Sequence, residues 1–66
     1  MSKSDFYYRC LNKYFYKHYG EYEFDAQWFI DPAENQWKFY IPEVGLLIAL
    51  TCDEYGHITK TEESLG

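Results

Sequence analysis

The side chains of this 66-residue sequence that most readily act as nucleophiles or general bases are Cys10, Cys52, His18 and His57. Cys52 and His57 flank Asp53, so a thiol, a base and an orienting carboxylate lie close together in sequence. The hairpin expected there does not by itself give them that geometry. The sequence also lacks GxSxG, HExxH and glycine-rich phosphate-binding motifs. We therefore expect no catalytic residues and interpret the protein as a non-enzyme.

The two cysteines do not form a metal-binding pattern, because the sequence has no CxxC motif and no Cys/His cluster. We expect neither a metal nor a cofactor. A small secreted domain held by disulfides usually carries about four to eight cysteines. Two reduced, partly buried thiols are the favoured interpretation, and a single Cys10–Cys52 disulfide is the alternative.

Three basic residues recur at a spacing of four on the expected helix, at Arg9, Lys13 and Lys17, with Tyr16 beside them. Such a strip could contact phosphates while the tyrosine stacks on a base. An ordinary solvated helix face has the same pattern. Because the net charge of −5 disfavours non-specific nucleic-acid binding, this nucleic-acid or nucleotide-binding face is the alternative hypothesis.

The charge of the sequence is divided unevenly along its length. Residues 1–20 carry four basic and one acidic side chain, whereas residues 21–66 carry two basic and ten acidic ones. This asymmetry predicts an acidic surface that engages a basic protein partner. The residues expected to supply it are Glu21, Glu23, Asp25, Asp31 and Glu34.

Apolar side chains are expected on the outer face of the sheet, at Phe29, Tyr40 and Leu47. Aromatic residues ringed by polar ones are typical of interface centres. One helix can cover only one face of a four-stranded sheet, so the second face is expected to be covered by another copy or another protein. We therefore predict a homodimer or higher oligomer through this face.

The hydrophobic periodicity of the sequence changes once, from that of a helix to that of strands. Residues 3–18 have helical periodicity, with Ser2 and Asp5 spaced as a capping box and Gly20 expected to end the helix. Period-two alternation follows, predicting strands over about 21–30, 36–41, 45–52 and 57–61, with a frayed tail after them. The register that aligns the apolar residues places Trp28 opposite Phe39, with Ile30 and Ala26 opposite Trp37 and Ile41, and Cys52 beside Ile58.

These elements predict an α+β fold, with an N-terminal helix packed on one face of a three- to four-stranded antiparallel meander (αββββ). A chain of 66 residues and 8.0 kDa allows a single domain, 1–66. The expected core comprises Tyr7, Leu11, Tyr14, Phe24, Trp28, Trp37, Phe39, Ile41, Leu46, Ile48 and Leu50.

The leading hypothesis is a small acidic protein-binding domain located in the cytoplasm, since no signal-peptide core or membrane span is recognisable. Compact acidic, aromatic-rich proteins of this kind include phage and mobile-element inhibitors of host nucleic-acid-binding or defence proteins, and that association is by class alone. A small-ligand binder formed at an oligomer interface is a further alternative.

Overall fold

Helix α1, a short 3-10 helix and four strands follow one another in the computed structural model, which describes residues 3–29 and 34–65. Their bounds are α1 Lys3–Tyr19, η1 Gly20–Tyr22, β1 Gln27–Phe29, β2 Gln36–Ile41, β3 Leu46–Cys52 and β4 Ile58–Ser64. The predicted αββββ arrangement is confirmed.

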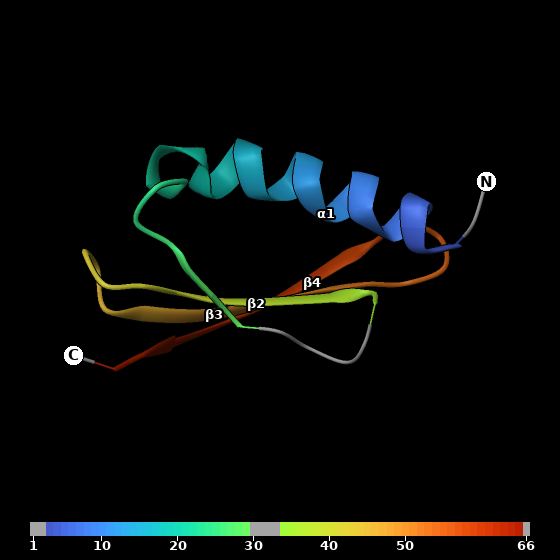
Figure 1. Cartoon of the computed structure of the whole chain (residues 1–66). Helices are drawn as coiled ribbons and strands as arrows, with labels where there is room; N and C mark the ends of the chain where they lie inside the picture. The colour runs from blue at the N-terminus through green and yellow to red at the C-terminus, as the bar shows by residue number, and fades with distance from the viewer. Residues whose placement is uncertain (1–2, 30–33, 66) are drawn as a thin grey trace.

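The strands form one antiparallel sheet in the order β1-β2-β3-β4, and α1 lies across one face of it (Figure 1). Neighbours in the sheet are neighbours in sequence, as a meander requires. We call the face under the helix the inner face and the opposite one the outer face. Within the described part of the chain, no element covers the outer face.

The strand register follows the apolar alternation of the sequence. Trp28 pairs with Phe39, and Cys52 pairs with Ile58, both as predicted. The paired β1 segment begins at Gln27, so the predicted pair of Ala26 with Ile41 lies just before it. The predicted partner of Trp37, Ile30, is outside the described residues.

The core lies between α1 and the central strands β2 and β3. Its buried members are Leu11, Phe15, Tyr19, Phe39, Ile41, Ile48, Leu50 and Cys52. Residues predicted for the core that pack against it while remaining partly exposed are Tyr7, Tyr14, Trp37 and Leu46. The sequence-based list missed Phe15, Tyr19 and Cys52. Tyr19 lies one residue beyond the predicted helix, but it is the last residue of α1 and is buried.

Two aromatic residues predicted for the core lie largely outside it. Phe24 is 96% exposed, and Trp28 is 48% exposed. Phe24 belongs to the connection between η1 and β1, where no strand directs alternate side chains inward. Trp28 is on the inner face, but β1 is the edge strand, and the helix covers the centre of the sheet more completely than this edge.

The first strand is much shorter than the predicted 21–30. Residues 20–26 instead form tight turns, closed by hydrogen bonds from the amide of Glu23 to the carbonyl of Gly20 (3.2 Å) and from the amide of Ala26 to that of Tyr22 (2.9 Å). Because β2 ends at Ile41, a longer β1 would extend past β2. The backbone N–H and C=O groups of its additional residues would then have no hydrogen-bond partners in the sheet. The acidic residues of this segment therefore do not share a strand face.

α1 ends at Tyr19, directly before Gly20 as predicted, but the backbone geometry of this end differs from that expected. Gly20 does not adopt the left-handed conformation of a helix-ending glycine, since positive φ angles occur only at Gly45 and Gly56 among the glycines described. The chain tightens into η1 at Gly20 and continues to turn toward the sheet. A 3-10 turn at a helix end satisfies some of the carbonyls that would otherwise lack partners.

The last strand is longer than predicted. β4 continues through Ser64, so Glu62 and Glu63 pair with Ile48 and Leu47 instead of belonging to a frayed tail. The polar sequence of this segment gave no strand signal. Its partner β3 supplies an unbroken row of backbone groups down to Leu46, and pairing with that row fixes the tail.

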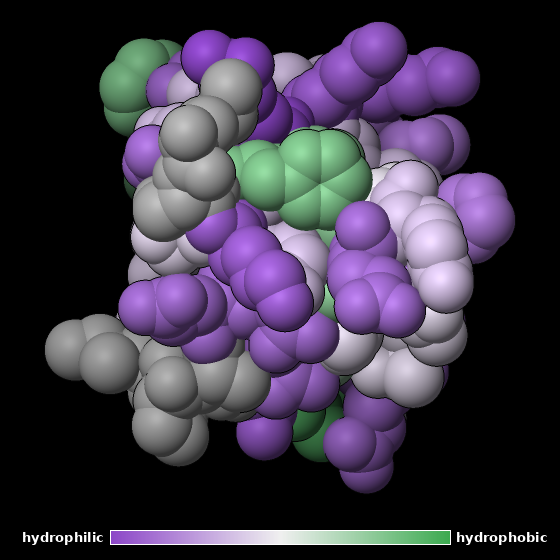
Figure 2. All heavy atoms as spheres, turned by 90° about the vertical axis from the view of Figure 1, so that its right-hand side faces the viewer, coloured by the Kyte–Doolittle hydropathy of each residue, from purple (hydrophilic) through white to green (hydrophobic). Residues whose placement is uncertain are grey.

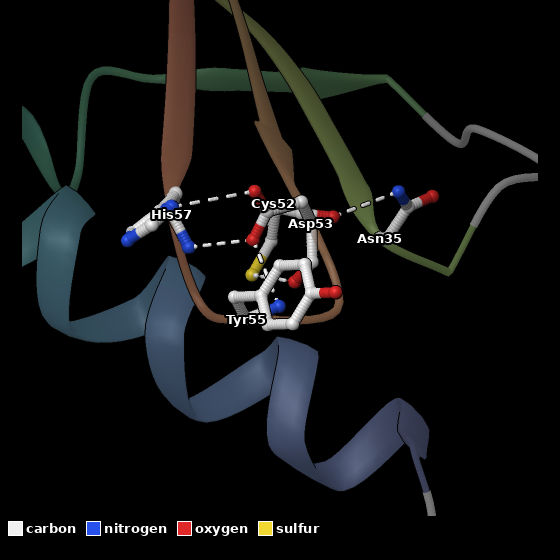
Figure 3. A network of polar contacts seen from close by, with 5 residues as sticks. All are labelled: Asn35, Cys52, Asp53, Tyr55 and His57. Atoms are coloured by element: carbon white, nitrogen blue, oxygen red, sulfur yellow. Dashed lines mark hydrogen bonds and ion pairs between the residues drawn. The ribbon is translucent and has the colours of Figure 1, made fainter.

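The β3–β4 turn is closed by the carboxylate of Asp53 (Figure 3). One of its oxygens accepts hydrogen bonds from the backbone amides of His57 (2.8 Å) and Tyr55 (2.9 Å). These bonds lower the pKa of Asp53, and the nearby His57 ring lowers it further. The turn lies beside the start of α1, at an end of the molecule whose surface is mostly hydrophilic (Figure 2).

Gly56 completes this turn with a φ of 85°. A Cβ atom at Gly56 would lie 3.2 Å from the Phe6 ring and 3.4 Å from the Cys10 sulfur. We expect Gly56→Ala to lower the free energy of unfolding by about 1–3 kcal/mol, because strain and crowding act together. Gly20→Ala is the control, since its Cβ meets only ordinary contacts at 3.5 Å or more and should leave stability unchanged or slightly higher. Urea unfolding of the two variants measures the difference, and equal midpoints would contradict the expectation.

Candidate functional site

An open groove of about 740 Å³ lies between the side of α1, the connection after η1 and the β1–β2 edge of the sheet. Its volume is within the range typical of ligand sites, roughly 300–1,000 Å³. Seven aromatic residues line it: Tyr8, Phe15, Tyr16, Phe24, Trp28, Phe29 and Trp37. Its polar lining residues are Asn12, Glu23, Glu34, Gln36 and Lys38. We call it the aromatic groove.

The walls of the aromatic groove are held by contacts between rings. Trp28 and Trp37 meet edge to face with ring centroids 5.4 Å apart, and Tyr8 meets Trp37 in the same way at 5.6 Å. Trp28 also packs on the buried ring of Phe15 at 4.9 Å. Edge-to-face pairs contribute about 0.5–1.5 kcal/mol beyond their buried area. Trp28 is thus anchored to the core, and Trp37 and Tyr8 are held against it in turn.

Two carboxylates give the aromatic groove an acidic character. The hydroxyl of Tyr16 donates a hydrogen bond of 2.5 Å to the carboxylate of Glu23, across the gap between α1 and the connection after η1. This bond raises the pKa of Tyr16, because losing the proton would place two anions together. Glu34 is exposed just before β2. Among the described residues that line the groove, two carboxylates stand against one lysine, Lys38, and this balance favours a positively charged occupant.

The aromatic groove brings together residues that the sequence assigned to three different surfaces. Glu23 and Glu34 come from the predicted acidic surface, Phe29 from the predicted outer face, and Tyr16 from the alternative nucleic-acid face. Pairing Tyr16 with a carboxylate makes its surroundings unfavourable to phosphate. Tyr16 of the alternative nucleic-acid face and Glu23 of the predicted acidic surface thus meet in this groove.

The remaining acidic residues are separate from the aromatic groove. Glu21 is exposed in η1, and Asp25 is exposed in the connection that follows. Neither lines the groove, and the strand face on which both were predicted does not exist. Asp31 lies outside the described residues.

The three cations of the predicted strip, Arg9, Lys13 and Lys17, are exposed on α1 as expected. None of them lines the aromatic groove. The strip therefore stands apart from the exposed rings that could stack on bases, while the function predicted for it stays a prediction.

Tyr40 and Leu47 lie on the outer face, where they pair directly across β2 and β3. Both are partly exposed, and Phe29 beside them is 50% exposed. These three residues thus lie on a face that no described element covers. Self-association through this face stays a prediction.

Of the residues considered for covalent chemistry, Cys52 ends β3 and His57 directly precedes β4, whereas Cys10 and His18 lie on α1. Both cysteines are free thiols. The Cys52 side chain is fully buried, and burial, with a smaller effect of the neighbouring Cys10 thiol, raises its pKa to about 11. A protonated, enclosed thiol is a poor nucleophile at neutral pH. The Cys52 thiol donates to the Asp53 carbonyl (3.4 Å), whereas the His57 ring lies 3.5 Å from the Asp53 carboxylate (Figure 3).

Sequence reasoning missed three important groove residues, Tyr8, Trp28 and Trp37. The helix sequence does indicate part of this groove, because Tyr8, Asn12 and Tyr16 are spaced by four residues. They form a stripe on α1 beside the stripe that faces the core. The tryptophans had no such signal, because they alternate with polar residues as core residues do. Only the position of β1 at the sheet edge makes Trp28 half-exposed.

No group of three or more histidine, cysteine, aspartate or glutamate side chains within residues 3–29 and 34–65 is arranged to hold a metal ion. None of the helical segments described is both long and apolar enough to cross a membrane. The chain is thus a small α+β domain with an aromatic-rich groove that carries the carboxylates of Glu23 and Glu34. Comparison with protein-family models, curated proteins and solved structures finds no match to this chain.

Proposed function

We propose that this chain is a non-enzymatic protein-binding domain whose aromatic groove takes a basic segment of a partner protein. The observation that carries the proposal is the combination of anchored, exposed aromatic rings with the carboxylates of Glu23 and Glu34 in one groove. Tyrosine and tryptophan are the side chains most enriched among interface hot spots.

The chemistry of the groove favours arginine in the bound segment. A guanidinium group can stack on an aromatic face and donate hydrogen bonds to a carboxylate at the same time. The groove offers both partners, since the rings of Tyr8 and Trp28 are about half exposed in the groove that Glu23 also lines. If the bound segment also carries the residues with which the partner contacts nucleic acid, occupying it would inhibit that partner. The proposal thus includes the inhibitor role suggested by the acidic composition.

The two tryptophans of the chain, Trp28 and Trp37, both line the groove, so intrinsic tryptophan fluorescence reports on this site. We expect an arginine-containing peptide to change this fluorescence saturably, and the same peptide with glutamine in place of arginine to do so far more weakly. The affinity should fall as salt is added, because the carboxylates are exposed. Identical titrations with the two peptides would overturn the proposal.

Charge reversal tests the role of the acidic residues. We expect the double variant Glu23→Lys/Glu34→Lys to bind the arginine peptide about tenfold or more weakly, because attraction becomes repulsion at the groove. The matched control is Glu43→Lys/Glu54→Lys, which changes the net charge equally at exposed turn residues that do not line the groove. An equal loss of affinity in the control would mean that overall charge, and not the groove, governs binding.

A further inference from the structure

The outer strand of the sheet, β4, presents a free edge of seven residues, Ile58–Ser64. It is the last strand in the sheet order, and no described strand pairs with its second edge. The opposite edge strand, β1, has only three residues. A long free edge can accept another strand through its unpaired backbone groups. We propose that β4 pairs with β4 of a second copy of this chain, antiparallel and across a two-fold axis at Thr61.

The hydrogen bonds at the two ends of the hairpin show which backbone groups of β4 are free. The amide of Asp53 donates to the carbonyl of His57 (3.0 Å), and the amide of Leu65 donates to the carbonyl of Gly45 (2.8 Å). Both bonds continue the β3–β4 register. Hydrogen-bonded and non-hydrogen-bonded pairs alternate in an antiparallel ladder. Every second residue between these ends therefore bonds to β3, namely Thr59, Thr61 and Glu63.

The backbone amides and carbonyls of the other four residues point to the free edge: Ile58, Lys60, Glu62 and Ser64. A second copy of β4 can form backbone hydrogen bonds with all four residues only when Thr61 lies opposite Thr61 of the partner subunit. Lys60 then pairs with Glu62 of the partner subunit, and Ile58 pairs with the partner's Ser64. Each such pair exchanges two backbone hydrogen bonds.

The charges on the edge select the same register. With Thr61 on the axis, each ammonium group of Lys60 is opposite a carboxylate of Glu62 from the other copy. Opposite charges directly across strands stabilise a sheet, and like charges destabilise it. Moving the register by two residues in one direction places Lys60 opposite Lys60 of the partner subunit. Moving it by two residues in the other direction places Glu62 opposite Glu62 of the partner subunit. Either shift therefore brings like charges together. Both shifts also leave one of the four free residues unpaired.

The side chains needed for these contacts are available on the surface. Lys60 and Glu62 both lie on the inner face of β4, where they now form an ion pair at 3.0 Å with side chains 39% and 34% exposed. In the dimer, the two pairs within the copies, one in each, would be exchanged for two pairs between the copies. Thr59, Thr61 and Glu63 are exposed on the outer face. The resulting dimer is isologous, and its sheet continues from one copy into the other.

Charge reversal gives the first test, read as the molecular mass in sedimentation equilibrium over a range of concentration. We expect a monomer–dimer equilibrium for the unchanged protein. Lys60→Glu and Glu62→Lys should each weaken dimerisation about tenfold or more, because each change creates two like-charge pairs across the axis. The Lys60→Glu variant presents only carboxylates at the paired positions, and the Glu62→Lys variant presents only ammonium groups. Mixing the two should therefore restore a dimer.

Two results of this experiment would overturn the proposal. One is a monomer at every concentration of the unchanged protein. The other is a dimer that persists in both single variants but is lost in Leu47→Glu, which would place the interface on the outer face instead. Circular dichroism of each variant excludes unfolding as the cause of a lost dimer.

Cross-linking tests the position of the axis independently. In a non-hydrogen-bonded antiparallel pair the Cα atoms lie about 4.5 Å apart, within the range that a disulfide spans. We expect Thr61→Cys to form a reducible covalent dimer under mild oxidation. The matched control is Thr59→Cys, an equally exposed threonine of the same strand that would lie opposite Glu63 of the partner subunit. Equal cross-linking of the two variants, or none in either, would contradict the register.

Discussion

Replacing Phe15 with alanine is expected to unfold most of the protein. The Phe15 side chain is 2% exposed at the centre of the interface between α1 and the sheet. Its ring lies 4.9 Å from Trp28 and 5.3 Å from Phe39, measured between centroids. Truncating a buried phenylalanine typically costs about 3–5 kcal/mol, through lost burial and the cavity left behind.

That cost is comparable to the whole stability that a domain of this size obtains from one core. A single core in a chain shorter than about 70–80 residues rarely contributes more than about 3–5 kcal/mol. The two cysteines are free, so no disulfide supports the core. We therefore expect Phe15→Ala to lose its cooperative thermal transition or to melt far below the unchanged protein.

Phe24→Ala is the control for this prediction, because it removes the same atoms from a side chain that is 96% exposed. Surface substitutions of this kind usually change stability by less than about 0.5 kcal/mol. Thermal melts followed by circular dichroism compare the two variants. A Phe15→Ala protein that melts near the control would mean that the helix is not fixed to the sheet through this ring.

The hydrophobic periodicity of single segments correctly predicted those parts of the fold that depend on one helix or strand alone. The helical periodicity of residues 3–18 identified Leu11 as a core residue, and the alternation of β2 identified Phe39 and Ile41; all three are buried. In both cases the residues that decide the outcome are consecutive or lie on one helix face. Matching the alternation of β1 with that of β2 then gave the pair of Trp28 with Phe39.

The incorrect predictions arose where a second element decides the outcome. Residues 21–25 alternate as a strand would, yet β2 ends at Ile41 and offers them no partner. Glu62 and Glu63 read as a tail, yet β3 offers them one. The length of a strand thus depends on the backbone of the neighbouring strand. The pattern of side-chain polarity within one segment gives no information about that neighbour.

The aromatic groove was hard to predict for a related reason. Its lining comes from α1, from the connection after η1 and from the β1–β2 edge. Sequence patterns sort residues within each of these segments, so Glu23, Phe29 and Tyr16 were assigned to separate surfaces. What joins them is the position of β1 at the sheet edge and the tight turn at residues 20–26, which places Glu23 within hydrogen-bonding distance of Tyr16.

The largest effect on partner binding is expected from Trp28→Ala. Trp28 is the residue at which the groove and the core meet, since it is 48% exposed yet packs against Trp37 at 5.4 Å and Phe39 at 4.8 Å. A large ring already held in place loses little conformational freedom when a ligand stacks on it. Interface residues of this kind contribute about 2 kcal/mol or more, so the affinity for the arginine peptide should fall about thirtyfold.

Two comparisons separate this effect from a loss of structure. Trp28→Phe keeps a ring against the core and should recover part of the affinity, whereas Phe24→Ala removes a groove ring that has no such anchor and should cost little. The fluorescence of Trp37 reports binding in every variant, and circular dichroism establishes that each is folded. A folded Trp28→Ala protein that binds the peptide as well as Phe24→Ala would mean that the anchored ring does not form the binding surface. The carboxylates alone would then have to account for recognition, and their exposed charges would make the remaining affinity strongly dependent on salt.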